Sequence, residues 1–141
     1  MTKKEKIIFI CTGNACRSQI AEGILRSMAG DKFDVFSAGS HPTKVHPMSI
    51  KVMKEIGIDI TSHTSDPISN FLNENIDIVV TVCSNADKAC PVFPGKVERI
   101  HWRIKDPFKG WGSDRDDLDN FTRTRDDLNE RIKNFLKNRL V

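Results

Sequence analysis

The residues with the clearest chemical potential lie in one short stretch of the chain, Cys11-Thr12-Gly13-Asn14-Ala15-Cys16-Arg17-Ser18. A cysteine stands at its first position and an arginine six residues later. An apolar run over residues 7–10 precedes the stretch, and a segment with apolar residues at helical spacing follows it. A loop that leads from a strand into the N-terminus of a helix turns several backbone N–H groups toward one point and forms a site for an oxyanion. The pattern therefore predicts an anion-binding loop with a thiol at its base.

The side chains within this loop suit that chemistry. Gly13 is expected to turn the chain with a positive φ, and Asn14 tolerates the left-handed region better than most residues. The planar guanidinium of Arg17 suits a tetrahedral oxyanion. The field that attracts the oxyanion also stabilises a thiolate, and the Ser18 hydroxyl can donate a hydrogen bond to the sulfur. We therefore interpret Cys11 as a nucleophile that faces a bound oxyanion.

A second pair of thiols, Cys83 and Cys90, follows the clearest strand-like segment of the chain, residues 76–82. Such a pair can act as a relay, in which one thiol attacks an oxidised sulfur at Cys11 and the other resolves the product. A disulfide needs Cα atoms within about 7 Å, so Cys90 reaches Cys83 only if the intervening segment folds back or loses its helical form. Two structural cysteines, or a zinc site with unusually wide spacing, are the alternatives. Cys16 is expected to be structural.

Asp106 is notable for its position after the last predicted strand and before Pro107. Attack on a tetrahedral oxyanion needs an acid that protonates the departing oxygen, and a carboxyl group on a loop over the site can supply that proton. An Asp-Pro pair that only starts a turn is an equally good interpretation. The four histidines show no ligand spacing and are expected in loops or on the surface.

These residues need elements that bring them together. Apolar runs of β-branched and aromatic residues predict strands over 6–10, 34–37, 76–82 and 97–102. Helical spacing and breakers predict helices over 18–29, 47–56, 66–72 and 113–140. This alternation predicts an α/β fold with a four-stranded, mainly parallel sheet flanked by helices. In such sheets the site lies beyond the carboxyl ends of the strands, so Cys11, Cys83 and Asp106 are expected at the same edge.

Length and composition limit the possible classes of function. The 141 residues are the size of one domain, and we expect a single domain over residues 1–141. No apolar run has the length of a membrane span or a signal-peptide core, which favours a cytoplasmic protein with no membrane partner. A net charge of +3 is too mild to indicate nucleic acid. Four cysteines in a cytosolic chain indicate catalysis, redox chemistry or metal rather than a disulfide framework. We expect a monomer.

Taken together, these motifs resemble a known family. The Cys-x5-Arg-Ser loop on the first strand–helix turn and the distant Asp106-Pro107 are similar to those of the low-molecular-weight protein tyrosine phosphatases. The pair Cys83 and Cys90, the run over residues 80–84 and the segment over 63–66 look more like the thioredoxin-coupled arsenate reductases built on that fold. The resemblance covers residues 6–107 and, more loosely, the last helix. Ala15 departs from a serine frequent in the family. The absence of tyrosine and the Phe108-Lys109 pair argue against a phosphotyrosine enzyme.

The resemblance implies reduction of arsenate to arsenite. Cys11 attacks arsenate held by the loop, and Asp106 protonates the departing oxygen. Cys83 then attacks Cys11 and releases arsenite, and Cys90 moves the disulfide to Cys83–Cys90, which thioredoxin reduces. The implied substrate-binding residues are Thr12, Gly13, Asn14, Ala15, Cys16, Arg17 and Ser18. No tightly bound cofactor is expected, although some members of the family bind potassium; the matching positions here are Asn14, Glu22, Ser37, Thr64 and Asp66.

Two other functions remain open on the sequence. A phosphatase that hydrolyses phosphomonoesters through a Cys11 phospho-enzyme would need Arg17 and Asp106 but neither of the distant cysteines. A non-enzymatic thiol switch or oxyanion-binding module would use the disulfide to change shape for a partner.

Overall fold

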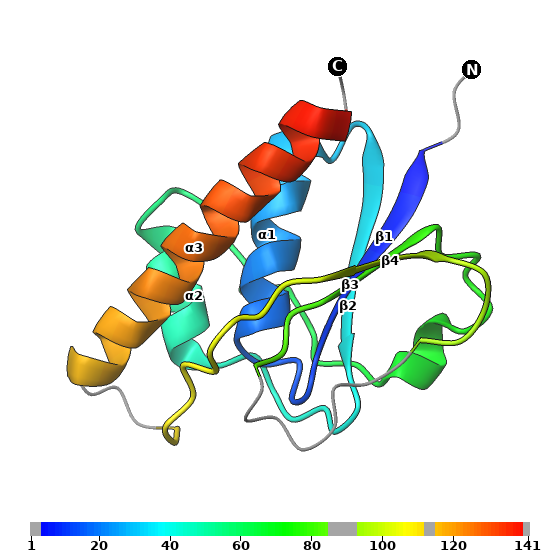
Figure 1. The fold of residues 1–141 in the computed structure, drawn as a ribbon. Coiled ribbons are helices and arrows are strands. Elements are labelled where there is room, and N and C mark those ends of the chain that lie inside the picture. Colours follow the sequence, from blue (N-terminus) through cyan, green and yellow to red (C-terminus); the bar gives the residue numbers. More distant parts are fainter. Residues whose placement is uncertain (1–3, 85–92, 112–114, 140–141) are drawn as a thin grey trace.

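A parallel sheet lies at the centre of the protein (Figure 1). The structure is a computed structural model that describes residues 4–84, 93–111 and 115–139. Within these residues the sheet has four strands in the order β2-β1-β3-β4, and each neighbouring pair is parallel. The strands are β1 (Glu5–Cys11), β2 (Phe33–Gly39), β3 (Ile78–Thr81) and β4 (Glu98–His101).

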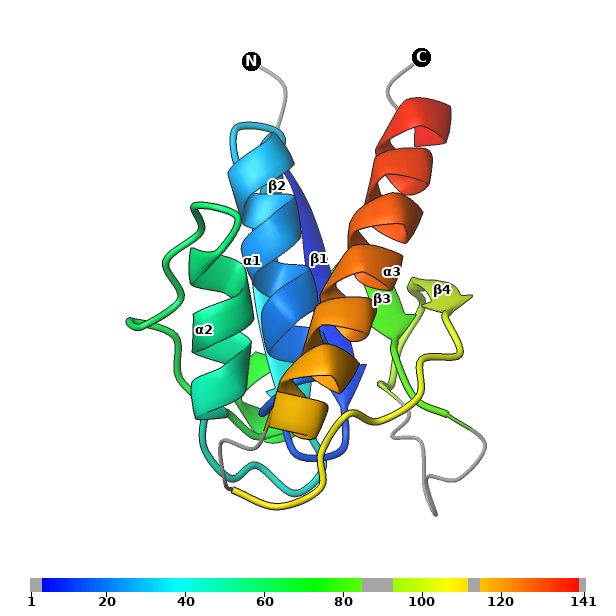
Figure 2. The ribbon, with the colours of Figure 1, turned by 90° about the vertical axis from the view of Figure 1, so that its left-hand side faces the viewer.

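The α-helices lie together on one face of the sheet, as the two ribbon views show (Figures 1 and 2). In the described part of the chain they are α1 (Arg17–Ala29), α2 (Pro47–Lys54) and α3 (Arg115–Arg139). α1 contacts β1 and β2 directly, whereas α2 packs against α1 and α3. The short 3-10 helix η1 (Ile68–Phe71) lies on the opposite face.

The central strand β1 is buried on both faces. Because side chains alternate along a strand, Ile7 and Phe9 face the core under the α-helices, while Ile8 and Ile10 face the core beside η1. All four are fully buried. A strand buried on both faces reads as a continuous apolar run, which is the pattern that identified it in the sequence. Its rigid position fixes where Cys11, its last residue, can stand.

The predicted fold and most of its elements are confirmed. The apolar face expected on the last helix packs into the core through Phe121, Leu128 and Ile132. The predicted helix over 66–72 is wrong in type, because Pro67 stays extended (φ −77°, ψ 154°) and only one 3-10 turn follows it. The strands predicted over 76–82 and 97–102 are each shorter than expected. Cys90 lies outside the described residues.

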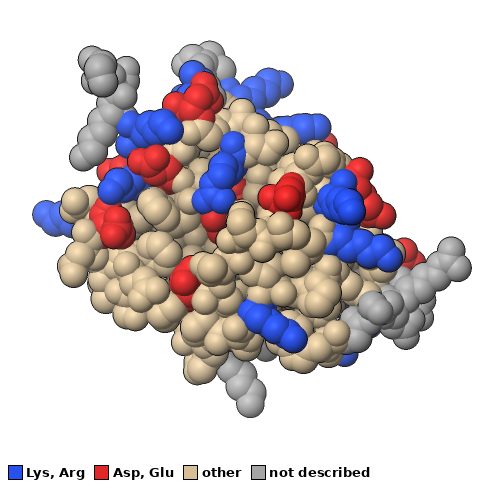
Figure 3. All heavy atoms as spheres, turned by 180° about the vertical axis from the view of Figure 1, so that it is seen from behind, with Lys and Arg blue, Asp and Glu red and all other residues tan. Residues whose placement is uncertain are grey.

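The end of α3 is joined to the sheet by Arg139. Its guanidinium donates to the carboxylates of Glu5 on β1 (3.0 Å) and Glu98 on β4 (2.8 Å). These hydrogen bonds raise the pKa of Arg139 above its ordinary value. Elsewhere charges are mixed: on the face in Figure 3, Lys and Arg side chains lie among Asp and Glu rather than in one continuous basic area. Among the described helices, none combines the length and the apolar character that crossing a membrane requires.

Candidate active site

The loop between β1 and α1 has its carbonyl groups turned outward. Each of the four carbonyl oxygens from Thr12 to Ala15 accepts a hydrogen bond from a group outside the loop. His41 N–H donates to Thr12 O (2.9 Å) and Thr43 N–H to Gly13 O (3.1 Å). The Gln19 side-chain amide donates to Asn14 O (3.0 Å), and His46 N–H donates to Ala15 O (3.0 Å). The peptide bonds are trans, and the C=O and N–H of a trans peptide point in opposite directions. The N–H groups of residues 13–16 therefore point to the inner side of the loop, where they form a cup for an anion.

Asn14 is the residue that makes the loop turn. It has φ 47°, whereas Gly13 does not have a positive φ, so the sequence-based expectation for Gly13 is wrong. The Asn14 side chain is held at both ends: its Oδ1 accepts from Asp66 N–H (2.8 Å), and its Nδ2 donates to Ser18 Oγ (2.7 Å) and Ser37 Oγ (3.0 Å). These bonds offset the cost of a left-handed backbone at a residue with a side chain.

Gly39 allows β2 to approach the loop closely. It pairs with Cys11 in the sheet register. A Cβ atom at Gly39 would lie 2.5 Å from the carbonyl oxygen of Thr12 and 2.9 Å from the backbone nitrogen of Asn14. Both are backbone atoms, so only glycine fits without a shift of the loop. The end of β2 thus packs directly against the backbone of the loop.

Cys11 is almost fully buried, and its sulfur lies 2.9 Å from Ser18 Oγ. Because Ser18 Oγ accepts from the Asn14 amide, its own proton is available for the sulfur. The thiol opens into a pocket of about 270 Å³ between the loop and two other segments. The other segments contribute His41, Thr43, Asp106, Phe108 and Trp111.

Cys16 differs from Cys11 in its surroundings. Burial, and then the negative charges of Cys11 and Asp106, raise the pKa of Cys16 far above its ordinary value. A thiol held neutral in this way is a poor nucleophile, which agrees with the structural role expected for it.

Arg17 joins the loop to the segment that carries Asp106. The buried guanidinium donates through Nη1 to Ile104 O (3.0 Å), and its Nη2 lies 3.6 Å from Asp106 Oδ2. The Asp106 side chain is 42% exposed, and its Oδ1 accepts from Phe108 N–H (3.0 Å). Asp106 therefore starts a turn and also stands at the rim of the pocket that contains Cys11, so its two sequence-based interpretations are compatible.

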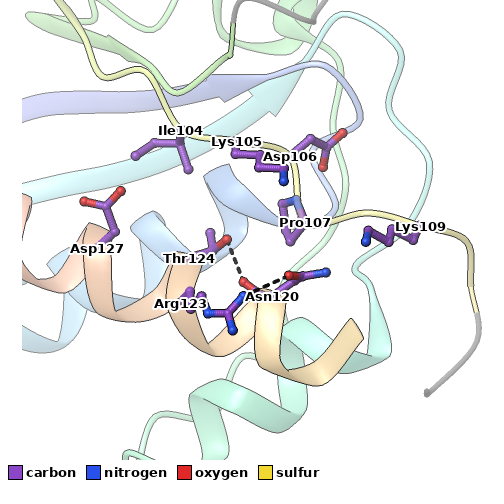
Figure 4. A pocket seen from close by; sticks show the side chains of 9 residues that line it. All are labelled: Ile104, Lys105, Asp106, Pro107, Lys109, Asn120, Arg123, Thr124 and Asp127. Carbon is purple, nitrogen blue, oxygen red and sulfur yellow. Dashed lines mark hydrogen bonds between the residues drawn. The ribbon is translucent and has the colours of Figure 1, made fainter. Parts of the chain in front are cut away.

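A second pocket of about 220 Å³ lies behind this segment, between it and α3. Figure 4 shows Asn120, Arg123 and Thr124 of α3 on one side, and on the other side Ile104, Lys105, Asp106, Pro107 and Lys109. The Asp106 carboxylate points away from α3. The carboxylate therefore does not face the second pocket. Its ion-pair partner is Arg17.

Cys83 lies two residues after the end of β3, the strand next to β1. Ile10 and Thr81 are partners in the sheet, and Val82 N–H donates to Ile10 O (2.9 Å). Ile104 N–H in turn donates to Cys83 O (3.2 Å). The buried Cys83 thus follows the strand end adjacent to Cys11 and is bonded to the segment that leads to Asp106. The structure brings these predicted residues to one edge of the sheet; Cys90 is outside the described residues.

Comparisons with known proteins agree with this geometry. A family model described as "Low molecular weight phosphotyrosine protein phosphatase" matches residues 6–140. The chain belongs to this family. It is 48% identical over 132 residues to an arsenate reductase of Halalkalibacterium halodurans, covering 94% of this chain and 95% of that protein.

Two solved structures are similar to this chain in fold. One is described as an arsenate reductase in the phosphate binding state; its TM-score is 0.80 at 34% identity, with 95% of this chain and 98% of that chain covered. Another is a thioredoxin-dependent arsenate reductase of Corynebacterium glutamicum, with a TM-score of 0.73 at 28% identity, covering 97% of this chain and 62% of that one.

The sequence analysis did not identify His46 as part of the site. It is fully buried, and its backbone N–H donates to Ala15 O. Its Nδ1 accepts from Met48 N–H (3.1 Å), so Nε2 carries the proton and donates to Gly110 O (2.8 Å). The ring also stacks on Trp111, with centroids 5.1 Å apart. His46 therefore connects the anion loop with the Asp106 segment; its only sequence signal is its place before Pro47 at a helix start.

The residues matched to potassium ligands lie together, but they bond to one another and to other protein groups. Asn14 Oδ1 accepts from Asp66 N–H, Ser37 donates to Glu22 (2.5 Å), and Thr64 donates to Asp66 (2.7 Å). The Arg26 guanidinium donates to Glu22 (2.5 Å), so a positive charge already lies in the site. Among the described residues there is also no group of three or more His, Cys, Asp or Glu side chains that could hold a metal. These residues do not fit a potassium ion.

Proposed function

We propose that this protein is an arsenate reductase that works through a relay of Cys11, Cys83 and Cys90, with thioredoxin as the reductant. The observation that carries the proposal is the position of Cys83 at the strand end adjacent to Cys11. The anion loop with its buried thiol and guanidinium, and the near full-length similarity to a protein named arsenate reductase, also support it.

The first step forms a bond between sulfur and arsenic. Arsenate is held by the loop N–H groups and Arg17, and the Cys11 thiolate attacks the arsenic atom. One hydroxyl group of the arsenate departs and takes a proton from the Asp106 carboxyl group, so water leaves and Asp106 becomes a carboxylate. Arsenic remains in its +5 state, bound to Cys11.

The next steps transfer two electrons. The Cys83 thiolate attacks Cys11 Sγ, a disulfide forms, and the sulfur–arsenic bond breaks with its electron pair on arsenic, which leaves as arsenite. Cys90 then attacks Cys83, the Cys83–Cys90 disulfide forms, and Cys11 is released as a thiolate. Thioredoxin reduces that disulfide through its own pair of thiols. The net reaction oxidises two thioredoxin thiols for each arsenate reduced.

This reaction fits a monomer in a reducing compartment such as the cytoplasm. The Cys11, Arg17, Asp106 and Cys83 side chains belong to one chain, so no second copy is needed. The reaction has no step through potassium, because the residues that would bind it already form hydrogen bonds with Arg26 and with one another.

The relay is tested by counting turnovers with arsenate, thioredoxin, thioredoxin reductase and NADPH. Cys83→Ser and Cys90→Ser should each abolish multiple turnover, and Cys11→Ser should abolish all chemistry. Cys16→Ala is the matched control for loss of one thiol, and it should continue through many turnovers. Undiminished turnover by the Cys83 or Cys90 variant would refute the relay.

Phosphomonoester hydrolysis is the second candidate, because the loop, Arg17 and Asp106 would suffice for it. Hydrolysis of p-nitrophenyl phosphate by the Cys83→Ala variant separates the two functions. Efficient hydrolysis with no arsenite formed by the unmodified protein would favour the phosphatase.

A further inference from the structure

Arg26 stands where a cation would neutralise Glu22. Its Nη2 donates to Glu22 Oε2 (2.5 Å) and to the carbonyl oxygen of Val35 (2.6 Å), and its Nη1 lies 3.0 Å from His63 Nε2. The guanidinium therefore bridges α1, β2 and the segment before η1. The Arg26 side chain is 45% exposed, whereas that of Glu22 is 11% exposed.

His63 is oriented to accept from Arg26. Its Nδ1 lies 3.0 Å from Gln19 Oε1, and an amide oxygen can only accept, so Nδ1 carries the proton. Nε2 is then the acceptor for Arg26 Nη1. The amide nitrogen of Gln19 donates to the carbonyl oxygens of Asn14 and Thr64. Arg26 is thus connected to the anion loop through His63 and Gln19.

The Glu22 side of the Arg26 contact leads to the nucleophile through hydrogen bonds that all run in one direction. The Glu22 carboxylate can only accept, so Ser37 donates to it and must accept from the Asn14 amide. The same amide donates to Ser18, whose proton is then directed to Cys11 Sγ (2.9 Å). The direction depends on an ionised Glu22, and an ionised, largely buried carboxylate depends on a positive partner.

We propose that Arg26 is a positioning residue that supplies this positive charge permanently, so that the anion loop is ordered without a monovalent cation. The role of the network in the reaction rests on the proposed arsenate reductase function. Removing the Arg26 charge should leave the Glu22 carboxylate without its positive partner, beside the hydroxyl oxygen of Ser37. A hard monovalent cation such as potassium can then bind to these oxygen atoms.

The test compares the unmodified protein with Arg26→Met in potassium chloride and in tetramethylammonium chloride at equal ionic strength. Arg131→Met is the matched control, because Arg131 also pairs with a carboxylate four residues away (Asp127, 2.8 Å) but lies on α3. Two readouts are used: the rate at which iodoacetamide alkylates Cys11, followed on its peptide by mass spectrometry, and kcat and KM for arsenate.

The unmodified protein and Arg131→Met should give the same values in both salts. In tetramethylammonium, Arg26→Met should lose about tenfold in alkylation rate and in kcat, the size expected for weakening one charge-assisted hydrogen bond. Potassium should restore most of this loss. Arg26→Lys, which keeps the charge, should need no potassium, and it serves as the second variant if Arg26→Met does not fold.

Two results would overturn the inference. One is a several-fold acceleration of the unmodified protein by potassium. The other is an Arg26→Met variant with the rates of Arg131→Met in both salts, or an Arg26→Lys variant that potassium accelerates several-fold. If the unmodified protein reduces no arsenate but its variants show the expected alkylation pattern, the proposed function fails and the role of Arg26 stands.

Discussion

Replacement of Gly39 by alanine tests whether the close packing of β2 against the anion loop determines the conformation of that loop. A Cβ atom at this position would lie 2.5 Å from Thr12 O, where an ordinary contact begins at 3.4 Å, so one of the two segments must move by about 0.9 Å. Neither can yield easily, because Gly39 is paired with Cys11 in the sheet and Thr12 O is held by His41 N–H.

Two effects of different size follow. Overpacking against backbone atoms costs about 2 to 3 kcal/mol of unfolding free energy, which lowers Tm by roughly 6 to 12 °C in a protein of this length. A displacement of nearly 1 Å in the loop also moves the N–H groups relative to the Cys11 sulfur. Misplacement on that scale costs about 100-fold in rate, so kcat/KM for arsenate should fall by about that factor.

The assay combines thermal unfolding followed by circular dichroism with steady-state arsenate reduction. Gly13→Ala is the steric control for stability, because a Cβ there would lie 3.6 Å from Thr43 Oγ1, at an ordinary contact distance. Its unfolding free energy should change by less than about 1 kcal/mol. If the Gly39→Ala variant has the Tm and the kcat/KM of the unmodified protein, the close packing of Gly39 does not determine the conformation of the loop.

Three further predictions concern side chains around the site. Asp106→Asn should slow the hydrolysis of phenyl phosphate by about 10²- to 10⁴-fold and that of p-nitrophenyl phosphate much less, since a better leaving group needs less acid; equal losses would contradict its role as an acid. His46→Phe keeps an aromatic ring but loses the bonds to Met48 N–H and Gly110 O, so urea denaturation should show a loss of about 2 to 4 kcal/mol, and an unchanged midpoint would refute this. Burial, and then the Arg26 charge, lower the pKa of His63 against the opposing effect of Glu22, so the unfolded chain binds the proton first as pH falls. The stability that His63 contributes should be complete above its ordinary pKa of about 6.5 and decline below it, and urea denaturation at pH 7.5 and 5.5 should show a smaller decline for His63→Gln.

The parts of the site that could be predicted from the sequence depend on local patterns. A continuous apolar run that ends at Cys11 can be read as a buried strand, and the loop after it leads into a helix whose apolar spacing is clear. The carboxyl ends of parallel strands meet at the same edge of a sheet, so the sequence alone places Cys83 and Asp106 at the edge that carries Cys11.

The parts that could not be predicted depend on contacts between distant segments. The positive φ at Asn14 rather than Gly13 follows from side-chain bonds to Asp66 and Ser37, which lie 52 and 23 residues away. Likewise, the outward direction of the loop carbonyls comes from donors such as His41 and His46, and no spacing in the sequence marks them as partners. The contact of Arg26 with Glu22 has ordinary helical spacing, but its connection to the nucleophile appears only through tertiary contacts.

The N–H groups that line the inner side of the loop have a consequence for selectivity. Together with the Arg17 guanidinium they recognise negative charge and a tetrahedron of oxygen atoms, which arsenate, phosphate and sulfate all present. Discrimination among these anions at the binding step is therefore weak, and abundant cellular phosphate should compete with the substrate. What distinguishes arsenic is the fate of the covalent adduct, because a second thiol can draw sulfur away from arsenic and leave it reduced, whereas a thiol cannot reduce phosphorus in this way.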